Sequence, residues 1–238
     1  MKKLLLFVML IPLIGMAQKN VINVTRVFPK MDKGSEFEKA LTAHAKKFHK
    51  GDWAWRVYEI LSGPDAGGYH ITEGPCSWEA LDSRGDLGVE HTTDWNKEVA
   101  IYLTDRGSSS YFDYNDSLST VVLTDWANKI LINHMYPKPG MIGNVMELAG
   151  KLKKVWVEGA ESVAVYQANS SGAPQVMTAT RLKNGLKELA AGYRKPLAER
   201  YNVAYGDGSW AGYLQDYAKC VESRWSEIIS YRADLSSK

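Results

Sequence analysis

The stretch Arg26-Val27-Phe28-Pro29-Lys30 occurs a second time in the chain, as His134-Met135-Tyr136-Pro137-Lys138. The offset is 134 − 26 = 108 residues, and the same offset relates Val57-Tyr58 to Val165-Tyr166. A match that keeps one register over this distance indicates an internal repeat. The chain is therefore expected to contain one structural unit twice.

Each copy is expected to run strand, helix, strand, strand, helical region, strand. Alternating side chains predict a strand over Val21–Phe28, and Ser35 with Glu38 forms a capping box that predicts the start of the first helix. The last strands of the two copies are expected over Tyr111–Leu118 and Trp225–Leu235. This order is the ferredoxin-like βαββαβ unit of the α+β class.

A ferredoxin-like unit leaves one face of its sheet bare, and that face must be buried. Two copies in one chain can bury their bare faces against each other, which closes a barrel with the helices outside. Together with the turn Lys138-Pro139-Gly140 after a first strand, this order resembles the dimeric α+β barrel superfamily, including its NIPSNAP-like and antibiotic-monooxygenase-like branches. The resemblance implies repeats over residues 18–118 and 129–238, joined by a linker over residues 119–128, and a monomeric pseudo-dimer.

The first 17 residues have the pattern of a secretory signal peptide. Lys2 and Lys3 precede an apolar run from Leu4 to Ile14, and a small-residue segment ends before Gln18. The apolar run is too short for a membrane span. We therefore expect an exported protein, periplasmic or extracellular, with no membrane span after cleavage.

The charge of the mature chain argues against a nucleic-acid partner. Removing Lys2 and Lys3 leaves 29 − 2 = 27 basic side chains against 27 acidic ones. No basic stripe remains for a polyanion to bind. The two cysteines, Cys76 and Cys220, either form a disulfide in an oxidising compartment or remain buried thiols, and no Cys/His cluster has zinc-site spacing.

The repeat points to one pair of polar residues, Arg26 and His134, which occupy the same position of the first strand in each copy. Both lie in an otherwise apolar row, where an unpaired polar group is costly. One interpretation is a ligand site, with Arg26 for an anionic group, His134 as ligand or base, and Tyr136 on the same face. The other interpretation is an internal salt bridge, with Glu59 as a possible partner of Arg26.

The family resemblance adds a second set of candidates. Haem-degrading and antibiotic-type monooxygenases of the superfamily carry an Asn on the first strand, and a Trp and a His in the second helical region. Asn133 matches the Asn in copy two, and His91 matches the His in copy one, where Thr25 and Leu81 replace the other two residues. The resemblance implies haem as a possible cofactor, although neither copy has the complete set.

The other histidines are expected to be structural: His44 as a packing residue, His49 near a helix end, and His70 on a strand. Three functions remain open. The first is binding of a small, largely apolar ligand, possibly haem, between sheet and helices. The second is a cofactor-independent or haem-linked monooxygenase that uses Asn133, His134 or His91, and the third is a structural protein with a filled barrel.

Overall fold

The structure is a computed structural model that describes residues 18–168 and 170–237. The predicted signal peptide, residues 1–17, lies outside the described residues. Within the described ranges, no helix combines the length and apolar character that crossing a bilayer requires.

The described elements follow the predicted order in both repeats. The first repeat contains β1 (Val21–Pro29), α1 (Gly34–Phe48), β2 (Trp55–Ile60), β3 (Tyr69–Cys76), α2 (Trp78–Arg84), α3 (Gly88–Asp94) and β4 (Leu103–Asn115). The second repeat contains β5 (Lys129–Pro137), α4 (Ile142–Glu158), β6 (Val163–Ala168), β7 (Gln175–Arg181), α5 (Leu197–Tyr205), α6 (Ser209–Cys220) and β8 (Val221–Tyr231).

The eight strands form one closed barrel in the order β1-β3-β2-β8-β5-β7-β6-β4. The two repeats are joined through antiparallel pairs, in which Tyr58 of β2 lies opposite Tyr231 of β8 and Tyr114 of β4 lies opposite Tyr166 of β6. Closure pairs the strand edges that each repeat alone would leave exposed. The predicted α+β barrel of two ferredoxin-like repeats is thereby confirmed.

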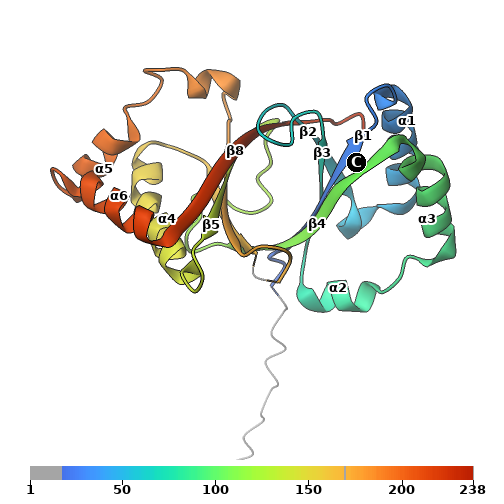
Figure 1. Cartoon of the computed structure of the whole chain (residues 1–238), viewed down its shortest axis with the longest axis horizontal. Coiled ribbons are helices and arrows are strands. Elements are labelled where there is room, and N and C mark those ends of the chain that lie inside the picture. Colours follow the sequence, from blue (N-terminus) through green and yellow to red (C-terminus); the bar gives the residue numbers. More distant parts are fainter. Residues whose placement is uncertain (1–17, 169, 238) are drawn as a thin grey trace, which may run out of the picture.

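The helices of the two repeats lie at opposite ends of the molecule, with the barrel between them (Figure 1). Because successive side chains of a strand point to opposite faces, the first strand divides its residues between two cores. Ile22 and Val24 belong to the barrel interior, whereas Val27 packs with Phe37 and Leu41 of α1. Polar residues on the inner face of a strand are therefore enclosed by the barrel.

The linker closes one end of the barrel. Leu123 packs into the interior cluster, and the buried Arg181 donates hydrogen bonds to the main-chain carbonyls of Leu123, at 3.3 Å, and of Asp125. Arg56 stacks over Trp126 at 4.2 Å from the ring centre. The cavity that Arg26 and His134 line lies away from the linker, and we call that end the mouth of the barrel or its open end.

The predicted capping box of α1 is wrong. The helix starts at Gly34, and its N-cap, Lys33, makes no side-chain capping bond. Glu38 instead accepts hydrogen bonds from Tyr69, at 2.6 Å, and from Arg232, at 2.6 and 3.0 Å. These long-range partners hold the carboxylate away from the helix terminus.

Two strand boundaries also differ from the prediction. β4 begins at Leu103 rather than Tyr111. The prediction missed its first half because these residues are polar and exposed and show no apolar alternation. β8 begins at Val221 rather than Trp225, since α6 passes into it without a loop.

Candidate functional site

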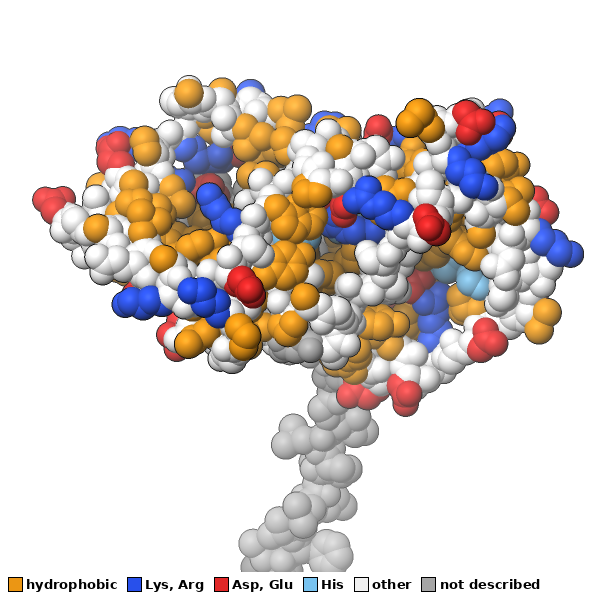
Figure 2. Space-filling model, viewed as in Figure 1, with side chains coloured by type: hydrophobic (Ala, Val, Ile, Leu, Met, Phe, Trp, Pro, Cys, Tyr) orange, Lys and Arg blue, Asp and Glu red, His pale blue; other side chains and the backbone are white. Residues whose placement is uncertain are grey.

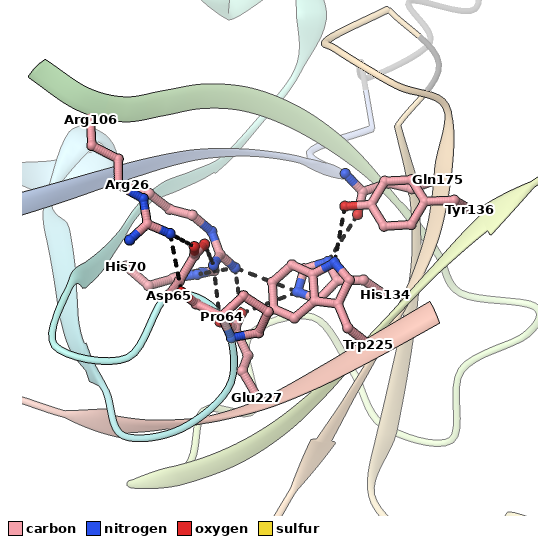
Figure 3. A network of polar contacts seen from close by, with 10 residues as sticks. All are labelled: Arg26, Pro64, Asp65, His70, Arg106, His134, Tyr136, Gln175, Trp225 and Glu227. Carbon is pink, nitrogen blue, oxygen red and sulfur yellow. Dashed lines mark hydrogen bonds and ion pairs between the residues drawn. The ribbon is translucent and has the colours of Figure 1, made fainter. Parts of the chain in front are cut away.

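Arg26 is the hub of a polar network at the open end of the barrel (Figure 3). Its guanidinium donates to Asp65 at 2.7 Å and to both carboxylate oxygens of Glu227, one of them at 2.9 Å. The Nδ1 atom of His70 lies 3.3 Å from Arg26, and Nε2 of His134 lies 3.1 Å from Glu227. The structure therefore brings Arg26 and His134 together, as the repeat indicated, around a carboxylate that the sequence did not single out.

Burial and pairing set the charges of this network. Burial lowers the pKa of Arg26, but the hydrogen bonds and charges of Glu227 and Asp65 outweigh it and raise the pKa overall. Burial raises the pKa of Glu227, but hydrogen bonds from His134 and Arg26 outweigh it and lower the pKa to about 2. Burial, with the nearby Arg26 charge, lowers the pKa of His70 to about 3. The network thus encloses a charged Arg26 and Glu227 beside a neutral His70.

A cavity of about 210 Å³ opens above this network. His134 lines the cavity, stacked on Trp225 with ring centres 3.9 Å apart and bonded to Gln175 at 2.9 Å. Tyr136 also lines the cavity and lies 3.4 Å from the indole nitrogen of Trp225. The cavity is below the 300–1,000 Å³ typical of ligand sites.

The two terminal nitrogens of the Arg26 guanidinium are committed to protein partners. This is the internal ion pair of the second interpretation, with Glu227 and Asp65 as partners instead of Glu59, which lies 3.6 Å from Arg232. A pair buried in this way satisfies its own charges and leaves little for an anionic ligand to bind.

A larger cavity, of about 480 Å³, lies between the sheet and the helices of the second repeat. Asn133 faces this cavity, on the opposite side of β5 from His134. Its aromatic walls come mainly from α4 and α6, and their members are Trp156, Trp210, Tyr213 and Tyr217. The planes of Trp210 and Tyr213 lie within 9° of parallel, with ring centres 4.9 Å apart. The cavity has the size and the apolar lining of a small-molecule site.

A few polar groups lie on the wall of this cavity. The buried hydroxyl of Tyr217 makes no hydrogen bond of normal distance and angle to a described residue, although the Arg224 guanidinium is close enough to oppose the rise of its pKa on burial. Arg200 is held by Glu161 at 2.6 Å, whereas Arg224 lies exposed at the cavity edge. Burial raises the pKa of Tyr217 and of Tyr213 above the ordinary tyrosine value. A ligand that accepts a hydrogen bond would satisfy the Tyr217 hydroxyl.

The lining of this cavity does not fit a haem that is ligated in the usual ways. Its described residues include no imidazole or thiolate, which are common axial ligands. The tyrosines that line it favour the neutral phenol, because burial raises their pKa, whereas iron binds the phenolate. The donor set of this cavity therefore does not suit haem iron.

The corresponding space in the first repeat contains His91 together with His44 and His49. The Nε2 atom of His91 lies 3.2 Å from Nε2 of His44 and 3.3 Å from Nε2 of His49. His44 is buried and packs against Phe48 and Trp55, and His49 caps the end of α1, as the sequence predicted for both. His91 is half-buried. Burial lowers the pKa of all three imidazoles. The three histidines converge on one point.

The predicted site residues thus lie in three separate places. Arg26, His134 and Tyr136 line the mouth of the barrel, Asn133 faces the second-repeat cavity, and His91 belongs to the histidine cluster of the first repeat. Asn133 and His134 are separated because adjacent residues of a strand point to opposite faces, whereas His91 lies on α3 of the first repeat.

The two cysteines are free and buried. Cys76 lies in β3 of the first repeat, and Cys220 ends α6 of the second. Burial raises the pKa of the Cys76 thiol to about 11. The structure therefore has buried thiols, the second of the two alternatives for this pair.

No protein-family model matches the sequence, and no curated protein sequence matches it either. Solved structures do resemble this one. An anthrone oxidase-like protein aligns with a TM-score of 0.60 and 12% identity, over 90% of this chain and 92% of its own. A candidate monooxygenase from Fusobacterium nucleatum subsp. nucleatum aligns with a TM-score of 0.54 and 10% identity, over 89% and 91% of the two chains.

A mutant chlorite dismutase from Candidatus Nitrospira defluvii aligns with a TM-score of 0.52 and 6% identity, over 90% of this chain and 92% of its own. Likeness at such low identity concerns the fold and not the reaction. Together with the closed barrel of two ferredoxin-like repeats, these alignments show that the chain has the dimeric α+β barrel fold, with both halves contained in one polypeptide.

Proposed function

We propose that the mature, exported chain binds a small, largely aromatic ligand that carries one anionic or hydrogen-bond-accepting group. The site of this ligand is the second-repeat cavity. The observation that carries the proposal is the combination of an aromatic-walled space of about 480 Å³ with the buried, unpartnered hydroxyl of Tyr217. A buried hydroxyl without a partner costs about 1–3 kcal/mol, and an acceptor atom on a ligand would remove this cost.

The geometry supports binding more directly than an oxygenase reaction. The carboxylate on the cavity wall, Glu161, is engaged by Arg200, so it is not free to act as a base. The aromatic side chains instead provide flat surfaces for a planar ligand, and pairs of aromatic rings contribute about 0.5–1.5 kcal/mol beyond buried area. Arg224 at the cavity edge would attract an anionic group on the ligand.

The test is a fluorescence titration of the purified chain with 1-anilinonaphthalene-8-sulfonate, an aromatic probe with one anionic group. We expect saturable binding at one site per chain. Trp210→Ala and Arg224→Gln should each weaken it about tenfold, which corresponds to about 1.4 kcal/mol. Arg106→Gln, at the exposed barrel mouth, is the matched control and should leave the Kd unchanged. Equal Kd values for all four proteins would refute the proposed site.

A further inference from the structure

Three of the five histidines of the chain meet at one point between α1, α3 and the sheet of the first repeat. One ring nitrogen from each of His44, His49 and His91 lies within 4.8 Å of the other two. His44 lies on α1, His49 directly follows that helix, and His91 lies on α3. Segments that are distant in the sequence therefore contribute to a single group of imidazoles.

The protonation of two of these rings is fixed by their other nitrogen. Nδ1 of His44 lies 2.7 Å from a carboxylate oxygen of Asp94, and Nδ1 of His49 lies 2.9 Å from one of Glu73. A carboxylate accepts hydrogen bonds, so Nδ1 carries the hydrogen in both rings, and in the neutral ring Nε2 is left as a lone pair. Two lone pairs thus point toward Nε2 of His91, whose single N–H could satisfy only one of them well.

The spacing of the nitrogens decides what could lie between them. Two nitrogens that bind one zinc ion at 2.0–2.1 Å with tetrahedral geometry are roughly 3.3 Å apart. Two nitrogens that bond one water at about 2.9 Å would be roughly 4.7 Å apart. The distances from Nε2 of His91 to His44 and His49, 3.2 and 3.3 Å, match the metal and are too short for the water, and the ligand nitrogens of His44 and His49 lie within 4.8 Å of each other.

We propose that His44, His49 and His91 bind one divalent transition-metal ion of the zinc class through their Nε2 atoms. Among the described residues no further histidine, cysteine or carboxylate joins the group. Three imidazole ligands with a position left for water are typical of zinc sites that exchange a ligand, whereas structural zinc sites have four protein ligands.

The side chains around His44 and His49 orient these rings in the way that metal-binding histidines are usually oriented. Histidine ligands usually donate their second N–H to a carboxylate, which fixes the tautomer and the orientation of the ring, and Asp94 and Glu73 accept such bonds here. Glu73 is itself held by the Trp55 indole, at 2.9 Å, and by Arg84. His49 stacks on Trp55, with ring centres 3.6 Å apart.

The second repeat provides an internal comparison. With the offset of 108, Leu152 and Val157 stand where the first repeat has His44 and His49. In the strand pairing, Thr180 lies opposite Leu131 as Glu73 lies opposite Asn23. The histidines and an orienting carboxylate are therefore present together in one copy and absent together in the other, where Leu152 and Thr180 line the second-repeat cavity instead.

Access to the centre is from the side of α3. His91 is half-buried, whereas His44 and His49 have 1% and 3% of their surface exposed. Histidine atoms reach the surface of the first-repeat lobe beside α3, on its side toward the strands (Figure 2). An ion can therefore enter beside His91 without opening the barrel.

The test is a Co²⁺ and Zn²⁺ titration of the untagged chain after treatment with a chelator, followed by visible absorption for Co²⁺ and calorimetry for Zn²⁺. We expect one ion per chain with a Kd below roughly 1 µM. Loss of a ligand in His91→Gln should weaken binding more than 100-fold, and Asp94→Asn should weaken it about 10–100-fold, as expected for a residue that orients a ligand. His70→Gln, which changes a buried histidine of the barrel, should bind as the wild type does.

Two results would overturn the proposal. One is the absence of stoichiometric Co²⁺ or Zn²⁺ binding by the folded wild-type chain, and the other is an unchanged Kd in both His91→Gln and Asp94→Asn. Circular dichroism of each variant shows whether it is folded, and His91 and Asp94 are chosen because they are not fully buried. The result is independent of the proposed aromatic ligand, which lies in the other repeat.

Discussion

Replacing Glu227 by Gln removes the carboxylate on which the network inside the barrel depends. Glu227 is 1% exposed and contacts Arg26 with both oxygens and His134 with one. In the variant, Arg26 retains Asp65, a loop residue that it shares with Arg106. The buried guanidinium loses its main counter-charge while the barrel around it stays the same.

The expected loss of stability in Glu227→Gln can be derived from the pKa of Glu227 and from the cost of breaking a buried ion pair. The pKa of Glu227 falls from 4.5 to about 2 on folding, which corresponds to roughly 3 kcal/mol at about 1.4 kcal/mol per unit. Removing one partner of a buried ion pair typically costs about 3–5 kcal/mol. We therefore expect Glu227→Gln to lower the free energy of unfolding by about 3 kcal/mol.

The assay is urea unfolding followed by tryptophan fluorescence, with Glu59→Gln as the matched control. The side chain of Glu59 is 41% exposed and lies 3.6 Å from Arg232, so its loss should cost less than about 1 kcal/mol. The double variant Arg26→Met, Glu227→Leu should recover most of the loss, because it removes both buried charges. A loss below about 1 kcal/mol in Glu227→Gln, or a double variant as unstable as the sum of its parts, would refute this account of the network.

The same carboxylate predicts a pH dependence. Because folding lowers the pKa of Glu227, its contribution is fully present above the unfolded value of 4.5 and is lost as the pH falls toward about 2. The difference in unfolding free energy between the wild type and Glu227→Gln should therefore shrink as the pH falls from about 5 to 2. A difference that stays constant over this range would show that charge is not the cause.

Three further predictions concern the fold. Gly63→Ala should destabilise the chain by about 1–3 kcal/mol, because the added Cβ would lie 2.7 Å from a main-chain oxygen of β8. Gly67 also has a positive φ but has open space around it, so Gly67→Ala should cost less in the same unfolding assay. Cys76 and Cys220 should each react with a thiol reagent in the unfolded chain and resist it in the native one, since both are free and buried. Light scattering should give the mass of a monomer, because the two repeats complete one barrel, and a stable dimer would count against this.

The fold could be predicted because its signals are local and repeated. Alternation identifies the strands, helical spacing identifies α1 and α4, and the offset of 108 shows that the second half repeats the first. The start of α1 was missed because Glu38, which looks like half of a capping box, is bound by Arg232 near the other end of the chain. Sequence spacing carries no information about such a partner.

The candidate sites were harder to predict, for geometric reasons. Glu227 looks like an ordinary strand residue in the sequence. Comparison of the two repeats would single it out, because the equivalent position in β4 is the uncharged Ser110. His44 and His49 are five residues apart, a spacing that does not share one face of a regular helix. They meet because the backbone leaves the helix at His49, with φ −112° and ψ 88°, and because α3 brings His91 to them.

The two repeats use the same space between sheet and helices in different ways. In the first repeat it holds imidazoles and the carboxylates that orient them, and in the second it holds an aromatic-walled cavity. The barrel between them contains an ion-pair network in which the buried charges satisfy one another. On this account, the duplication preserved one architecture and produced two chemically distinct sites.

The most direct test of this account is a crystal structure of the untagged chain grown with Zn²⁺, with an anomalous difference map measured at the zinc absorption edge. We predict one strong peak bounded by the Nε2 atoms of His44, His49 and His91, and none at the equivalent position beside Leu152 and Val157. A map without a peak among the three histidines would contradict the assignment of different chemistry to the two repeats.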